Sequence, residues 1–255
     1  MTKQEYLQEL NKAFGDFKFF EEDHHYEYKD QRIGVSVTRF IEQYANEFDA
    51  DTIAQKVAIK EGKSVQEVLD EWQIKNEWAC FKGSLSHQYV QEKFESDCNQ
   101  MFYPDDEVKR DALNKIYHQA DCFYEDYKDR LELLANEKII GSEVYDIASA
   151  VDSLFINKLT GGLVLVDYKT NSNIHKNERY AKDMKAPLSH LKDTTLSHYF
   201  IQVSIYKYLI EKYTDLEVDE WFIVWFSENN EEYQVIDVPY LKEEVEKILE
   251  WRKWE

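Results

Sequence analysis

The chain has 255 residues, of which 51 are acidic and 31 are basic, and its formal net charge is −20. A content of 43% hydrophobic and 15% aromatic residues argues against a disordered chain, and the strong acidity argues against non-specific adhesion to nucleic acid or anionic lipid. The apolar runs are too short to cross a bilayer and the amino terminus is charged, so we expect no membrane partner. The three cysteines are scattered, which predicts reduced thiols in a cytoplasmic protein.

The first half of the chain has mainly helical periodicity. Residues 2–14 predict a short amphipathic helix, and residues 24–37 predict two short strands around a polar turn. Ser36 or Thr38 is suited to cap the helix that follows. From about 51 to 135 the pattern is again helical. The expected helices cover 51–62, 64–96 and 113–135.

The second half changes to an alternating period. Strands are expected over 138–148, 150–158, 163–170, 220–227 and 233–238, and helices over 196–213 and from 241 onward. A hairpin turn is expected at 159–162. A helical first half, a small mixed central β-sheet and flanking helices predict a single α+β domain over 1–255. Within it, residues 1–80 form a helical and hairpin region and residues 81–255 form the core.

Two charges end the apolar strand "LVLVDYK". Asp167 and Lys169 are two residues apart, so they share one face of the strand. The hairpin brings Asp152 toward Asp167, since facing residues of antiparallel strands lie roughly 4.5–5.5 Å apart. Two carboxylates that close repel one another, and a hard cation such as Mg²⁺ or Mn²⁺ relieves the repulsion. Because the lysine could hold or deprotonate a water, or stabilise a phosphate, the pattern indicates metal-assisted phosphodiester hydrolysis.

Four blocks in chain order extend this pattern. They are "GSLSHQYVQEKFE" with His87, "AVDSLF" with Asp152, "VDYKT" with Asp167 and Lys169, and "FIQVSIYKYL" with Gln202 and Tyr206. Together they span about residues 83–210, and they resemble the PD-(D/E)XK nuclease superfamily, specifically its RecB-like exonuclease branch of phage type. The resemblance implies a restriction-endonuclease-like core.

The resemblance also implies a role for each matched residue. The expected ligands of Mg²⁺ or Mn²⁺ are His87, Asp152, Asp167 and the backbone carbonyl of Tyr168. Lys169 is the expected catalytic lysine, and Gln202 and Tyr206 are expected to position the lysine strand or the DNA backbone. The cysteines lack the pattern of the iron–sulfur members of the branch, so no iron–sulfur cluster is expected.

The chain departs from the family pattern at two positions. Gln91 stands where many relatives have glutamate, a change expected to weaken a second metal position. Ser149 stands where they often have glycine, which we interpret as a tolerated packing change. Glu143, nine residues ahead of Asp152 in the sequence, is a candidate additional carboxylate.

A locally basic segment, residues 173–193, follows the lysine strand. Phosphate contacts and stacking on one aromatic ring would let it guide a nucleic-acid strand into the site. The residues expected to do so are Lys176, Arg179, Lys182, Lys185 and, for stacking, Tyr180. The alternative is an ordinary solvated loop.

The motifs together predict a metal-dependent deoxyribonuclease. The resemblance favours an exonuclease that acts on DNA ends or single-stranded DNA in recombination, repair or phage DNA metabolism. The alternatives are a structure-selective endonuclease or nickase, and a nuclease-fold binding module that engages a protein partner or imitates DNA. Because a net charge of −20 opposes DNA binding, recruitment by a partner protein would supply the missing affinity.

Overall fold

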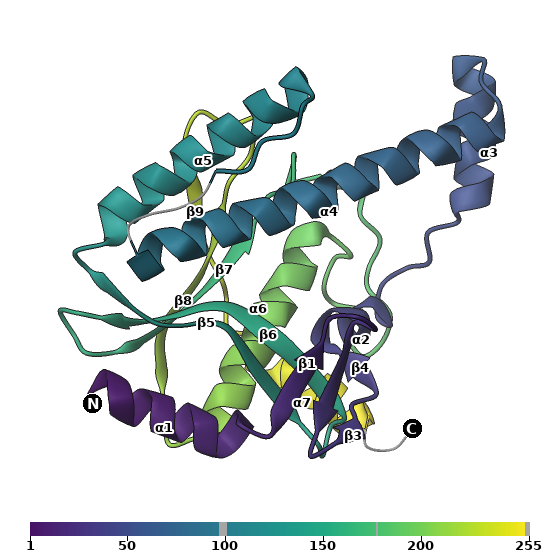
Figure 1. The fold of residues 1–255 in the computed structure, drawn as a ribbon. Helices are drawn as coiled ribbons and strands as arrows, with labels where there is room; N and C mark the ends of the chain where they lie inside the picture. Colours follow the sequence, from purple (N-terminus) through teal and green to yellow (C-terminus); the bar gives the residue numbers. More distant parts are fainter. Residues whose placement is uncertain (97–100, 177, 253–255) are drawn as a thin grey trace.

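A central β-sheet between two groups of helices organises the chain (Figure 1). The computed structural model describes residues 1–96, 101–176 and 178–252. Within these ranges the sheet consists of β4 (Val35–Ser36), β5 (Leu131–Ser142), β6 (Ile147–Asn157), β7 (Leu163–Lys169), β8 (Val218–Trp225) and β9 (Gln234–Asp237). The order is β4-β6-β7-β8-β9, with β5 also paired to β6. The β4–β6 and β7–β8 pairs are parallel and the others antiparallel, which confirms the predicted α+β class with a mixed sheet.

Helices cover both faces of the sheet. They are α4 (Val65–Ser96) and α5 (Glu107–Tyr127) on one face, and α6 (Thr195–Tyr213) and α7 (Lys242–Arg252) on the other (Figure 1). Successive residues of β7 join opposite cores, with Val164 and Val166 on the α4–α5 side and Leu163 and Leu165 on the α6–α7 side. A strand buried on both faces is apolar throughout, as its sequence predicts. In the described ranges, none of the helices has the length and apolar character that crossing a membrane requires.

The amino-terminal residues pack against the α6–α7 side of the sheet. Helix α1 (Lys3–Phe14) begins with a capping box, in which the amides of Glu5 and Thr2 each donate to the side chain of the other residue. A separate small sheet follows, made of β1 (Phe17–Phe20), β2 (His25–Tyr28) and β3 (Gln31–Arg32). Of these strands, β1 is missing from the sequence prediction. Ser36 caps α2 (Val37–Glu42), and it is one of the two predicted caps.

A helical arm extends from this body (Figure 1). It consists of α3 (Ala50–Glu61) and the first turns of α4. A small cluster that contains Ala54, Ala58 and Val68 joins the two helices. The arm follows the predicted helical segments closely.

The sequence prediction is wrong at the end of α5. The helix ends at Tyr127, whereas a helix over 113–135 was expected, and β5 begins at Leu131. The apolar residues in "LELLA" suit either a helix or a strand, so their spacing alone is ambiguous. Pairing with β6 from Leu131 to Ser142 decides in favour of a strand.

Phe155 tests the packing of the α4–α5 side. Its ring is fully buried and lies 4.8 Å from the ring of Phe94, centroid to centroid. Phe155→Ala should lower the free energy of unfolding by about 3–5 kcal/mol, because it removes buried contacts and leaves a cavity. Leu159→Ala, at a side chain that is 83% exposed, should change it by less than about 0.5 kcal/mol. Chemical denaturation of both variants measures the difference, and equal losses would contradict this packing.

Candidate metal centre

The site forms where β7 separates from β6. The two strands pair from Ile156–Leu163 to Ser153–Val166, and beyond this point β7 continues its pairing with β8. The backbone amide of Tyr168 donates to Oδ2 of Asp152 at 2.7 Å. The Asp152 side chain therefore accepts the hydrogen bond that a β6 carbonyl would otherwise accept. This bond fixes the Asp152 carboxylate at the point where the two strands separate.

His87 on α4 and Glu137 on β5 converge on Asp152. Nδ1 of His87 lies 3.6 Å from Oδ2 of Asp152. The neighbours of Glu137 in β5 pair with the neighbours of Asp152 in β6, so these two residues fall opposite one another. One ligand atom from each of the three residues lies within 4.8 Å of the other two. An imidazole and two carboxylates at this spacing suit a divalent cation.

Gln91 holds Glu137 in this cluster. Its Nε2 donates to Oε1 of Glu137 at 2.7 Å and to the carbonyl of Asp152 at 3.1 Å. Glu137 has a φ of 46°, in the left-handed region that non-glycine residues adopt at an energetic cost. Gln91, one of the two departures from the family pattern, therefore supports the cluster through its amide.

Asp167 and Lys169 form an ion pair beside the cluster. Nζ of Lys169 lies 2.6 Å from Oδ2 of Asp167, whose side chain is 1% exposed. Among the described residues, neither oxygen of Asp167 has a hydrogen-bond partner of regular geometry. The ammonium of Lys169 also lies 4.5 Å from the centroid of the Tyr199 ring, a cation–π contact.

Burial shifts the pKa of these groups. It raises the pKa of Asp152, although Lys169 and the amide of Tyr168 partly oppose the shift. It also raises the pKa of Asp167, to about 6. The pKa of Glu137 is raised for the same reason. Burial and then the charge of Lys169 lower the pKa of His87, which favours the neutral imidazole that binds metals.

These groups fit a divalent cation. The ligand atoms of His87, Glu137 and Asp152 are gathered, and the Asp167 carboxylate beside them is buried without a regular hydrogen bond. A cation among them would supply the positive charge that these crowded carboxyls lack. The gathered group does not include Asp167, so its role as a ligand stays a prediction.

Tyr206 and Gln202 connect α6 to the sheet. The hydroxyls of Tyr206 and Ser149 are 2.9 Å apart, and Nε2 of Gln202 donates to the Tyr206 hydroxyl at 2.7 Å. Ser149 lies on β6, three residues before Asp152. The contact therefore fixes the strand that carries Asp152. The role that the resemblance implies for these residues, positioning the lysine strand or the DNA backbone, stays a prediction.

The basic segment lies after β7 and includes the short 3₁₀ helix Glu178–Tyr180. Lys176 and Lys182 are exposed, and Tyr180 is 82% exposed. Nζ of Lys185 lies 3.9 Å from Oε1 of Glu47. The side chain of Arg179 lies outside the part of the chain that the structure describes.

The carboxylate that β5 contributes is Glu137, not the candidate Glu143. Glu143 is exposed in the turn between β5 and β6, and it is not a member of the gathered ligand group. The prediction failed because it began the strand at 138. A strand started at Leu131 would have carried Glu137 alongside Asp152 in the antiparallel register.

Comparisons with known proteins add little to this geometry. No family model matches the chain, and no curated protein matches it. A solved structure described as "Crystal structure of SSO0001" aligns with 68% of this chain and 86% of its own, at 13% identity and a TM-score of 0.26. A similarity this low supports no assignment of fold or function.

Glu137 and Glu143 provide a matched test of the metal centre. Glu137→Gln removes a ligand charge, so it should weaken Mn²⁺ binding at least about tenfold, as losses at metal sites commonly do. Glu143→Gln removes the same charge from the exposed turn and should leave the affinity unchanged. Isothermal titration calorimetry with Mn²⁺ measures both dissociation constants. Equal affinities for the two variants would remove Glu137 from the site.

Proposed function

We propose that the protein is a Mg²⁺- or Mn²⁺-dependent deoxyribonuclease. It hydrolyses phosphodiester bonds at DNA ends or in single-stranded DNA, in recombination, repair or phage DNA metabolism. The observation that carries the proposal is the convergence of His87, Glu137 and Asp152 beside the Asp167–Lys169 ion pair. The order of the matching motifs in the chain supports the same chemistry.

Three side chains would hold the cation. They are His87, Glu137 and Asp152, and the carbonyl of Tyr168 is a further proposed ligand. The backbone amide of Tyr168 donates to Asp152, so this residue lies beside the three side chains. When bound, the cation would polarise the phosphate and neutralise its charge.

Lys169 acts as a cation toward the phosphate, not as a base. Although burial acts to lower it, the pKa of Lys169 is raised by the charges of Asp167 and Asp152. The side chain is therefore an ammonium at neutral pH. Held by Asp167, it donates hydrogen bonds to a phosphate oxygen and stabilises the negative charge that grows there in the transition state.

The acidic surface makes a recruiting protein part of the proposal. At physiological ionic strength, dissolved ions screen the interaction between surface charges that are more than about 8 Å apart. Acidic groups far from the metal centre therefore repel DNA only weakly, but a surface with a net charge of −20 does not attract DNA either. A partner protein that delivers DNA ends would raise their local concentration.

A cleavage assay tests the proposal directly. The substrates are end-labelled linear DNA and circular DNA, each in single- and double-stranded form, with Mg²⁺, Mn²⁺ or a chelator. We expect metal-dependent degradation of the linear substrates. Lys169→Met should lower kcat by at least about 100-fold, since it removes a charge that stabilises the transition state.

Lys60→Met, at an exposed position of α3, controls for the loss of a lysine and should leave kcat unchanged. DNA that stays intact with every metal would refute nuclease activity. Cleavage of circular DNA as fast as linear DNA would assign an endonuclease in place of an exonuclease.

The basic segment generates a separate prediction on salt dependence. Replacing Lys176, Lys182 and Lys185 together with alanine should flatten the plot of log affinity for single-stranded DNA against log salt. The slope should fall by about 0.7 for each phosphate that the protein no longer neutralises. Fluorescence anisotropy over a salt series measures it. Replacing three exposed lysines of the arm, at positions 56, 60 and 75, should preserve the slope, and an equal slope in both triple variants would exclude the segment from DNA binding.

A further inference from the structure

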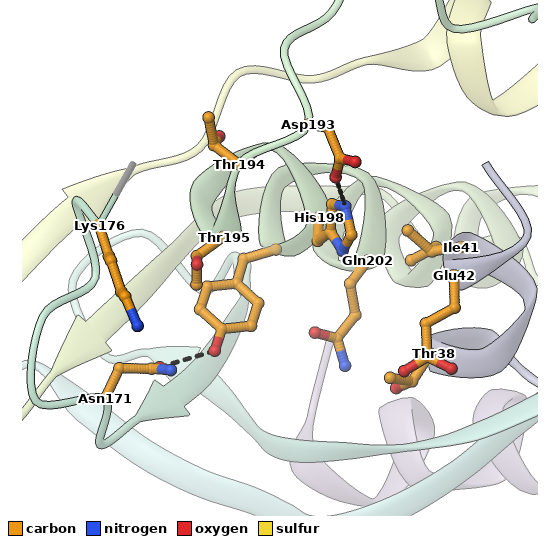
Figure 2. A pocket seen from close by; sticks show the side chains of 11 residues that line it. Thr38, Ile41, Glu42, Asn171, Lys176, Asp193, Thr194, Thr195, His198 and Gln202 are labelled. Carbon is orange, nitrogen blue, oxygen red and sulfur yellow. Dashed lines mark hydrogen bonds and ion pairs between the residues drawn. The ribbon is translucent and has the colours of Figure 1, made fainter. Parts of the chain in front are cut away.

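A cleft of about 440 Å³ lies between α2, α6 and the segment after β7 (Figure 2). Its walls come from parts of the chain that are far apart in sequence. The residues that line it include Thr38, Asn171, Lys176, His198, Tyr199 and Gln202. This volume falls in the range of roughly 300–1,000 Å³ that is typical of small-molecule sites.

One aromatic ring separates this cleft from the metal centre. Tyr199 lines the cleft, and its ring also lies 4.5 Å from Nζ of Lys169. The hydroxyl of Tyr199 donates to Oδ1 of Asn171 at 2.6 Å, which fixes the ring between the two sites. A group bound in the cleft would therefore adjoin a phosphate held at Lys169.

The end of the cleft near β7 suits a phosphate. Figure 2 shows the ammonium of Lys176 directed toward Asn171. In the described ranges, Lys176 has no ion-pair partner, so its charge is available to a ligand. A phosphate in this position is attracted by a cation that no carboxylate neutralises.

The opposite end suits a heterocyclic base. Figure 2 shows His198 and Gln202 on α6 facing Thr38 and Ile41 on α2. The Gln202 amide nitrogen is engaged by the Tyr206 hydroxyl, which leaves the amide oxygen to accept a hydrogen bond. The amide oxygen of Gln202 and the hydroxyl of Thr38, beside an apolar side chain, can hydrogen-bond to the edge of an unpaired base.

Two acidic residues also line the cleft, and neither blocks a nucleotide. Asp193 is occupied by donors, with His198 Nε2 at 2.8 Å from one oxygen and the amide of Asn46 at 2.6 Å from the other. Glu42 is exposed on α2, beside Thr38 and away from Lys176 (Figure 2). At that end it can accept from the exocyclic amino group of a base.

We propose that this cleft binds one unpaired nucleotide of the DNA strand, the one next to the phosphate that is cleaved. The inference rests on the proposed nuclease function and specifies its substrate. The nucleotide lies with its phosphate at Lys176 and its base between α2 and α6. A paired nucleotide must leave its partner to enter the cleft, so single-stranded ends are preferred over blunt duplex ends.

A variant that fills the cleft tests this proposal. Thr38→Trp places an indole in the cleft from an exposed position on α2, and Gln55→Trp places one on the exposed face of α3 as a control. Fluorescence anisotropy without metal measures the affinity for a labelled single-stranded oligonucleotide and for a blunt duplex. We expect the wild type and Gln55→Trp to favour the single strand at least about tenfold, because a duplex nucleotide must first be unpaired and unstacked. Thr38→Trp should lose this preference and keep its affinity for Mn²⁺.

Competition with a free deoxynucleoside monophosphate identifies the source of the nucleotide. If only other DNA strands displace the oligonucleotide, the cleft binds a nucleotide that is part of a strand, as proposed. Displacement by the monophosphate at low concentration would overturn that part of the proposal and assign the cleft to a free nucleotide. Wild-type strand preference in Thr38→Trp would overturn the proposal entirely.

The cleft and the nuclease activity can fail separately. DNA degradation with no effect of Thr38→Trp on strand preference would leave the nuclease and refute the cleft. A strand preference that depends on Thr38, without any cleavage, would leave the cleft and refute the nuclease.

Discussion

The crowding of carboxyl groups where β6 and β7 part is the constraint on which the rest of the site depends. Asp152, Asp167 and Glu137 approach one another there, and burial raises the pKa of all three. Lys169 supplies one positive charge, and it is committed to Asp167. Carboxylates this close together repel one another when so little positive charge offsets them, and a divalent cation is the simplest group that would neutralise them.

The surrounding fold holds these groups at fixed positions. Asp152 is held by the amide of Tyr168, and its strand is tied to α6 through Ser149 and Tyr206. Gln91 holds Glu137 from α4, the helix that also carries His87. His87, Glu137 and Asp152 therefore each have a partner on another element, so their geometry follows from the packing of the helices on the sheet. Such support is what keeps a metal site ready for its ion.

The part of the site that could be predicted from sequence is the part built from local structure. Asp152, Asp167 and Lys169 lie on one hairpin, where strand alternation fixes which residues meet. Glu137 was missed because the apolar run from Leu131 suits both a helix and a strand, so the strand was started one residue too late to include it.

The cleft between α2 and α6 could not be predicted for a different reason. Thr38 and Gln202 lie on helices far apart in the sequence, and their proximity results from packing on the same face of the sheet. Nothing in either helix alone indicates a ligand. The sequence contributed only the basic character of the segment after β7, which includes Lys176 at one end of the cleft.

The most direct test of the central claim is anomalous X-ray scattering at the manganese absorption edge from crystals grown with Mn²⁺. We predict an anomalous peak bonded to His87, Glu137 and Asp152, beside the Asp167–Lys169 pair. The absence of a peak there at Mn²⁺ concentrations that saturate the protein in solution, or a peak at another group of residues, would contradict the account.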